Sequence, residues 1–240
     1  MMKYKLILTL IFTTAVNSQN LSFIYKKISN EKIEAVKLDR IKSVISSIPQ
    51  VSYELIVNDS ISSFTVIDKV YTPDFNKGAI SYGGGSNFYV KKKNNELHSL
   101  ESTSVFNDSY LKKSTTLTSD WKITNESKMI NGYICYKANM KREKFLLKAT
   151  NSKNPEIKKI EKEIIAWFCP EFPYSFGPDE FFGLPGIVFE AYHSDGKILF
   201  AIDKIELKSN KKIKATPKLK LITEEEAVKY TLDIMKNNLN

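Results

Sequence analysis

Two adjacent acids are the residues of this sequence best placed to do chemistry. Asp179 and Glu180 adjoin a stretch rich in proline and glycine, and a pair of carboxyl groups in a cleft is able to work as acid and base. Neighbouring acids more often face water. The two histidines, His98 and His193, lie in different predicted hairpins, and no Gly-x-Ser-x-Gly elbow is present. The sequence therefore assigns no catalytic residue and favours a protein that is not an enzyme.

The sequence also predicts no metal site and no cofactor. Cys135 and Cys169 are the two cysteines, and neither Cys-x-x-Cys nor His-x-x-x-His spacing occurs. The run Gly83-Gly84-Gly85-Ser86 lacks the Lys-Ser/Thr ending of a phosphate-binding loop. If a strand at 133–140 pairs with one at 164–168, a Cys135–Cys169 disulfide becomes sterically possible. The sequence leaves open whether this disulfide forms.

The sharpest local signal is a proline-aromatic segment at Pro170–Gly186. It holds four of the eight prolines and three of the nine glycines, interleaved with aromatic rings. Such a chain loses little entropy on folding and carries a large apolar area, so we expect an ordered loop packed on a sheet. The loop either presents its residues to a ligand or partner or simply seals the core. The candidate contacts are Phe172, Tyr174, Phe181, Phe182, Gly183, Leu184, Pro185 and Gly186.

The elements that must position this loop are mostly strands. Alternating β-branched and aromatic residues recur between turn signals from residue 51 onwards. The clearest hairpin joins 187–192 to 197–207 through Asp195-Gly196. Apolar spacing of three and four residues predicts a helix over 31–48. Thr223 and Glu226 form a capping box that opens a second helix near the C-terminus.

These elements predict a mainly β protein. Short turns between successive strands favour an antiparallel curved sheet or a partly open barrel, with one N-terminal and one C-terminal helix. No repeat or low-complexity linker divides the chain, so 19–240 is expected to be a single domain.

The N-terminus predicts export. Lys3 and Lys5 precede an uncharged apolar stretch that is too short to span a bilayer, which is typical of a signal peptide over 1–18. No cysteine stands directly after this stretch, so we expect a protein that is not a lipoprotein. We expect it to be periplasmic or secreted, with no transmembrane segment after cleavage. The net charge of +9 comes almost entirely from lysine. Because nucleic-acid contacts favour arginine, we expect a solvated basic surface and no nucleic-acid partner.

The sequence resembles the GLPGLI family of exported Bacteroidetes proteins. The motif that gives the family its name stands here as residues 183–188, Gly-Leu-Pro-Gly-Ile-Val. Ala166-Trp167-Phe168 and Pro170-Glu171-Phe172-Pro173 precede it, and Lys128–Tyr133 and Cys135–Ala138 resemble the central block of the family. Cys169 stands where the family usually has threonine. The resemblance implies export and one undivided domain, and it brings no established reaction.

Two functions remain. The first is a non-enzymatic binding or envelope-accessory module that uses the proline-aromatic loop to hold an apolar or peptide-like ligand or to dock on an outer-membrane protein. The alternative is a periplasmic hydrolase with an acidic cleft near Asp179 and Glu180. An enclosed apolar cavity favours the first, and converging acids with raised pKa values favour the second. A purely structural envelope protein is a third possibility.

Overall fold

The structure is a computed structural model that describes residues 20–29, 52–67, 87–91, 95–105, 108–149, 155–194 and 198–237. These residues form a 12-stranded sheet and, within the described ranges, a single α-helix, α2. The elements are β1 (Asn20–Ser29), β2 (Ser52–Val57), β3 (Ile61–Val66), β4 (Asn87–Lys91), β5 (Glu96–Val105), β6 (Asp108–Leu117), the 3-10 turn η1 (Thr118–Asp120), β7 (Lys122–Ile130), β8 (Tyr133–Ala149), β9 (Pro155–Cys169), β10 (Ile187–His193), β11 (Ile198–Ser209), β12 (Lys220–Thr223) and α2 (Glu224–Asn237).

All twelve strands belong to one open sheet. Their order is β12-β6-β5-β4-β3-β2-β1-β11-β10-β9-β8-β7, so β12 and β7 are its edges. Every pairing is antiparallel except that of β12 with β6, which is parallel. The prediction of a mainly β, antiparallel fold is confirmed. Within the described residues the sheet is open, because its edge strands β12 and β7 are not paired with each other.

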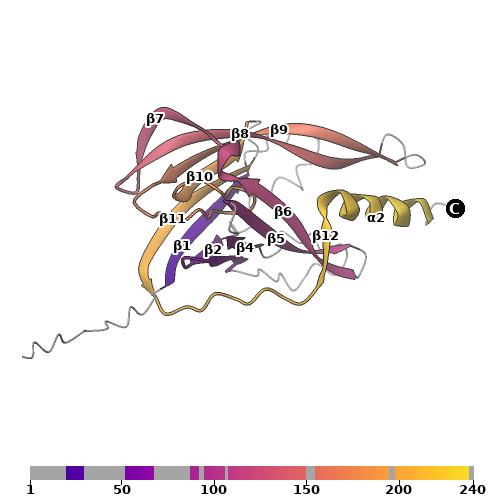
Figure 1. The fold of residues 1–240 in the computed structure, drawn as a ribbon, viewed down its shortest axis with the longest axis horizontal. Coiled ribbons are helices and arrows are strands. Elements are labelled where there is room, and N and C mark those ends of the chain that lie inside the picture. Colours follow the sequence, from indigo (N-terminus) through magenta and orange to yellow (C-terminus); the bar gives the residue numbers. More distant parts are fainter. Residues whose placement is uncertain are drawn as a thin grey trace, which may run out of the picture.

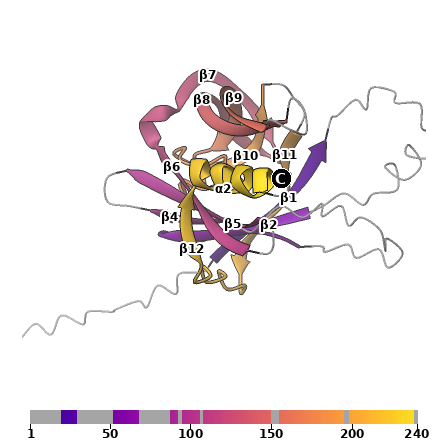
Figure 2. The ribbon, with the colours of Figure 1, turned by 90° about the vertical axis from the view of Figure 1, so that its right-hand side faces the viewer.

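The sheet bends so that its two halves face each other. In Figure 1 the strands β7, β8 and β9 lie above β2, β4 and β5, β11 runs down the left side, and β12 and α2 lie on the right. The end-on view of Figure 2 shows α2 between the two halves, below β8 and β9 and above β5 and β6. The contacts of the helix agree, because it touches β8 and β9 on one side and β6 and β12 on the other. The helix therefore fills one end of the space between the halves.

Two locally coded elements are present as predicted. Strands β10 and β11 form the expected hairpin, with Glu190 opposite Ala201 and Tyr192 opposite Leu199. The helix α2 begins with the predicted capping box. The Thr223 N–H donates to Glu226 Oε2 at 2.7 Å, and the Glu226 N–H donates to Thr223 Oγ1 at 3.2 Å. The predicted helix over 31–48 and the predicted signal peptide over 1–18 lie outside the described residues.

The apolar core lies between the two halves of the bent sheet. Phe23 and Tyr25 of β1 and Leu55 of β2 are fully buried there, as are Ala191 and Phe189 of β10. The Tyr25 hydroxyl is satisfied because it donates to the Val188 carbonyl at 2.6 Å. A concave apolar face of this size needs a cover, and the segment between β9 and β10 provides it.

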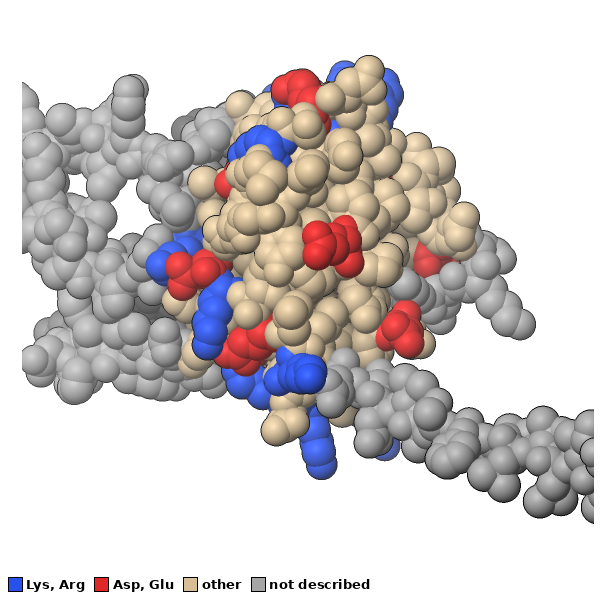
Figure 3. All heavy atoms as spheres, turned by 90° about the vertical axis from the view of Figure 1, so that its left-hand side faces the viewer, with Lys and Arg blue, Asp and Glu red and all other residues tan. Residues whose placement is uncertain are grey.

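The charged surface is mixed in sign. On the face shown in Figure 3, basic and acidic side chains lie interspersed among uncharged residues, and no continuous basic area is visible there. Many lysines are paired with acids, as in Lys26–Asp203 at 2.6 Å and Lys211–Glu54 at 2.7 Å. This is the arrangement of a solvated lysine-rich surface.

Candidate functional site

The proline-aromatic loop Pro170–Gly186 is ordered by its own backbone. The Gly183 N–H donates to the Ser175 carbonyl at 2.9 Å, and the Phe181 N–H donates to the Pro178 carbonyl at 2.9 Å. Two bonds tie the loop to the start of β10, from Ile187 N–H to the Phe172 carbonyl at 3.0 Å and from Val188 N–H to the Phe176 carbonyl at 3.2 Å. Because these groups have partners, the loop is able to lie inside the protein without the cost of unpaired polar backbone.

The aromatic rings of the loop point into the core. Phe181 is 1% exposed, Phe182 is fully buried and Phe172 is 6% exposed. Phe181 packs against Phe200 of β11, with ring centroids 6.2 Å apart, and Phe182 packs against Tyr89 of β4 at 5.2 Å. These rings are the cover of the concave sheet face.

Of the two roles left open for the loop, the burial of these rings favours sealing the core. Gly183, Leu184 and Gly186 are buried with the phenylalanines, Tyr174 is half-buried, and Pro185 alone of the eight candidate residues is exposed. The physical reason is that an open, bent sheet leaves more apolar surface than its own strands can cover. Trp167, near the end of β9, is buried in the core.

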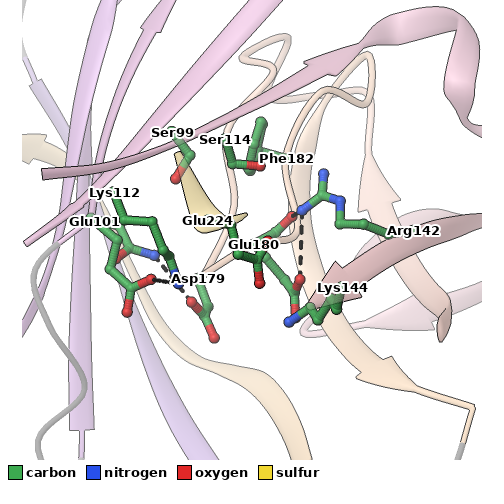
Figure 4. Close-up of a pocket in the computed structure, with 11 residues that line it drawn as sticks. Ser99, Glu101, Lys112, Ser114, Arg142, Lys144, Asp179, Glu180, Phe182 and Glu224 are labelled. Atoms are coloured by element: carbon green, nitrogen blue, oxygen red, sulfur yellow. Dashed lines mark hydrogen bonds and ion pairs between the residues drawn. The ribbon is translucent and has the colours of Figure 1, made fainter. Parts of the chain in front are cut away.

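The polar residues of the same loop open onto a pocket. Figure 4 shows Asp179 and Glu180 between a wall formed by β5 and β6 and a wall formed by β8. The cavity has a volume of about 60 Å³. That volume is enough for a few water molecules or one small polar group. Its lining residues are Asn87, Ser99, Glu101, Lys112, Ser114, Arg142, Lys144, Asp179, Glu180, Phe182 and Glu224.

Asp179 is held in an unusual backbone conformation beside this pocket. Its φ is +45°, in the left-handed region that aspartate tolerates better than most residues. The Asn87 amide donates to Asp179 Oδ1 at 3.1 Å, and the Tyr89 hydroxyl donates to the Asp179 carbonyl. Burial raises the pKa of the Asp179 carboxyl, and the nearby Glu180 and Glu101 carboxylates raise it further.

Glu180 has the opposite electrostatic environment. Lys144 Nζ lies 2.6 Å from Glu180 Oε1, His193 Nε2 lies 3.0 Å from the same oxygen, and Arg142 Nη1 lies 3.6 Å from Oε2. Burial by itself raises the pKa of Glu180, but the hydrogen bond from His193 and the charges of Lys144 and Arg142 outweigh it and bring the pKa to about 2. Two consecutive carboxyl groups are thus pushed in opposite directions.

Arg142 connects the loop to two other elements. Its Nη1 donates to the Glu180 carbonyl at 2.9 Å, and its Nη2 donates to Thr116 Oγ1 in β6. The guanidinium also lies over the Phe182 ring, 5.2 Å from the centroid. A largely buried planar cation with several fixed donors is suited to such a junction. The sequence offered one signal for it, because Arg142 is one of only two arginines in a lysine-rich chain.

The contacts of Glu180 with Lys144, His193 and Arg142 predict that the folded protein loses stability in acid. The pKa of Glu180 falls from an ordinary 4.5 to about 2 on folding, which corresponds to about 3 kcal/mol of stability. Because the folded-state pKa is the lower one, this stability is present above pH 4.5 and is lost as the pH falls towards 2. The variant Glu180→Gln should lose a similar amount at pH 7, measured by urea unfolding, and should show a flatter loss between pH 4.5 and 2.

The control for that experiment is Glu143→Gln, which removes an exposed acid paired with Lys159 at 2.7 Å. An exposed pair contributes little, so the control should change the unfolding free energy by less than about 1 kcal/mol. Equal effects of the two variants would contradict the prediction.

The two cysteines are brought together by the sheet. Tyr136 of β8 pairs with Phe168 of β9, and continuing this antiparallel register by one residue sets Cys135 opposite Cys169. Both side chains are buried free thiols, and the Cys135 thiol donates to the Tyr133 carbonyl at 3.8 Å. The predicted strand pairing on which a disulfide depends is therefore confirmed, and the disulfide itself stays a prediction.

No group of three or more His, Cys, Asp or Glu side chains in the described ranges is arranged to hold a metal ion. No helix within those ranges has the length and apolar character needed to cross a membrane.

Comparison with known proteins gives a partial match. Residues 121–190, which run from the start of β7 into β10, match the family described as "Protein of unknown function (Porph_ging)". No curated protein matches the chain. Two solved structures are similar, "Structure of PNGF-II in C2 space group" with a TM-score of 0.47 and "Structure of PNGF-II in P21 space group" with a TM-score of 0.48. In both, the identity is 17%, and the match covers 89% of this chain and 33% of the other. The chain thus spans about a third of the length of these structures.

Proposed function

We propose that this protein is an exported, non-enzymatic binding module of the GLPGLI type, and that its ligand enters the polar pocket beside Asp179 and Glu180. Export is supported by the signal-like sequence at 1–18, and the family by the Gly183–Val188 motif. The observation that carries the binding proposal is that five separate parts of the fold direct polar side chains at one open volume: β4, β5 with β6, β8, the loop and α2. The acids of the loop line the pocket, while its aromatic rings are buried in the core next to them.

The charges of the pocket favour an uncharged polar ligand group. Lys112 is paired with Glu101 at 2.6 Å, and Lys144 and Arg142 are both paired with Glu180. An anion would have to compete with these carboxylates for the cations. Amide or hydroxyl groups, such as those of a peptide, instead find donors and acceptors in side chains that are already neutralised. The small volume admits one such group, with the rest of the ligand at the mouth.

The test is a binding measurement on the purified protein with matched variants. Ligands recovered with the protein from its own envelope are identified by mass spectrometry and returned to the apo protein in calorimetric titrations. We expect Asp179→Asn to weaken binding at least tenfold, because it replaces one pocket acceptor by a donor and keeps the shape. Asp233→Asn, an exposed change on α2, should leave the affinity unchanged.

Two results would contradict the binding proposal. One is equal affinity of the two variants for the recovered ligand, and the other is the absence of any ligand or protein partner that binds the purified chain. In either case the pocket has no role in recognition.

The alternative function, hydrolysis, is favoured by one specific observation. The pKa of Asp179 is raised while that of Glu180 is about 2, and such a split is how two acids take different roles in catalysis. In this case Asp179 is the proton donor. Because a donor must be protonated, the rate should fall as the pH rises through the raised pKa of Asp179. Peptide and glycoside substrates incubated with the protein from pH 4 to 8 test this, and Asp179→Asn should abolish any turnover.

A further inference from the structure

The fold places the two thiols of the chain where a covalent bond between neighbouring strands is possible. Directly opposite residues in an antiparallel pair have Cα atoms about 4.5–5.5 Å apart, and a disulfide accepts about 4.4–6.8 Å. Cys135 and Cys169 are opposite by the register of β8 and β9, which pairs their neighbours Tyr136 and Phe168, and both side chains are buried. The Cα separation expected for opposite residues thus lies within the range that a disulfide accepts.

We propose that Cys135 and Cys169 form an intramolecular disulfide when the chain folds under oxidising conditions. The two thiols lose two protons and two electrons as the S–S bond forms. The oxidant is a disulfide, either of a small molecule or of a thiol-disulfide oxidoreductase, and it is reduced to two thiols in the exchange. That such conditions occur in the cell rests on the export in the proposed function.

Because both cysteine side chains are buried in the folded protein, their burial determines at which stage of folding the disulfide is able to form. Both cysteines are 0% exposed, so a disulfide reagent does not reach them in the closed fold. Burial, together with the adjacent Cys169, raises the pKa of Cys135 to about 12, which removes the thiolate that exchange requires. Oxidation therefore precedes the closing of the sheet. Once closed, the sheet protects the bond from reductants.

The disulfide would also link the ends of the proline-aromatic loop to β8. Cys169 is the last residue of β9, and its carbonyl accepts the Phe172 N–H at the start of the proline-aromatic loop. On its other side Cys169 is opposite Ile187, at the end of the same loop. A disulfide to Cys135 thus fixes to β8 the point where the loop leaves and re-enters the sheet. It closes the whole β8–β9 hairpin, which lowers the entropy of the unfolded chain.

The test counts thiols by mass spectrometry on two preparations. The first is protein purified from its own cells without reductant, and the second is the same protein reduced, unfolded and refolded in a glutathione redox buffer. Each is unfolded and treated with N-ethylmaleimide. We expect no label before reduction, two labels after it, and a cross-linked peptide containing both cysteines. The oxidised form should melt about 5–10 °C above the reduced form.

The variants Cys135→Ser and Cys169→Ser are the controls. Each should carry one label or one glutathione adduct, and neither should show the reductant-dependent change in melting temperature. Two free thiols in the refolded wild-type protein would overturn the proposal. A disulfide in the refolded protein together with two thiols in the purified protein would support the pairing and count against export alone.

Discussion

Replacing Phe181 and Phe182 together by serine should unfold the protein or lower its stability by more than about 5 kcal/mol. The two rings are 1% and 0% exposed and pack against Phe200 and Tyr89 on opposite halves of the sheet. Truncating one buried phenylalanine costs about 3–5 kcal/mol, and the total stability of a domain is about 5–15 kcal/mol. Near-UV circular dichroism during heating measures the effect.

A milder variant and a control keep this prediction open to refutation. Phe182→Leu leaves most of the apolar volume, so it should fold and melt several degrees below the wild type. Met129→Ser changes a side chain that is 63% exposed and should melt within about 2 °C of the wild type. A double serine variant that melts like Met129→Ser would show that the loop rings do not cover the core.

Alanine at Gly186 should destabilise the fold by about 3 kcal/mol or more. A Cβ at this position would lie 2.3 Å from the Cys169 carbonyl oxygen and 2.7 Å from its carbon, and neither backbone atom is able to turn aside. The close approach exists because the end of the loop lies against the end of β9. Overpacking of this kind forces backbone shifts. The midpoint of urea unfolding measures the loss.

Gly132→Ala is the matched control for this steric effect. Gly132 has a φ of +85° in the β7–β8 turn, but no atom lies within 4 Å of an added Cβ. The cost there is only the left-handed conformation, about 1–2 kcal/mol. We therefore expect Gly186→Ala to be the more harmful change. The reverse order would contradict the close packing of the loop on β9.

These predictions treat the proline-aromatic loop as a structural element with a polar edge. Its rings cover the apolar face of the sheet, and its Glu180 pairs with Arg142 and Lys144 of β8. The guanidinium of Arg142 joins the two, because it contacts both the Phe182 ring and Glu180. A change to the rings should therefore disturb the pocket as well, whereas Asp179→Asn addresses the pocket alone.

The sequence by itself determined the elements that are specified by residues close together in the chain. The β10–β11 hairpin follows from a turn signal between two alternating strands, and the start of α2 follows from Thr223 and Glu226, three residues apart. The prediction that the loop is ordered follows from its prolines and aromatic side chains. In each case the interacting groups are near in the chain, so the pattern of residues carries the information.

Only the tertiary structure decided which way the loop faces and what its acids meet. The sequence could not distinguish rings presented to a ligand from rings sealing a core, because that depends on how much apolar surface the bent sheet leaves open. It also gave no means to place Arg142 and Lys144 against Glu180, or Lys112 beside Glu101 at the same pocket. The contacts of Glu180 join the loop to β8 across 36 and 38 residues of the chain. They arise from the bending of one open sheet, which brings its two halves and α2 around the loop.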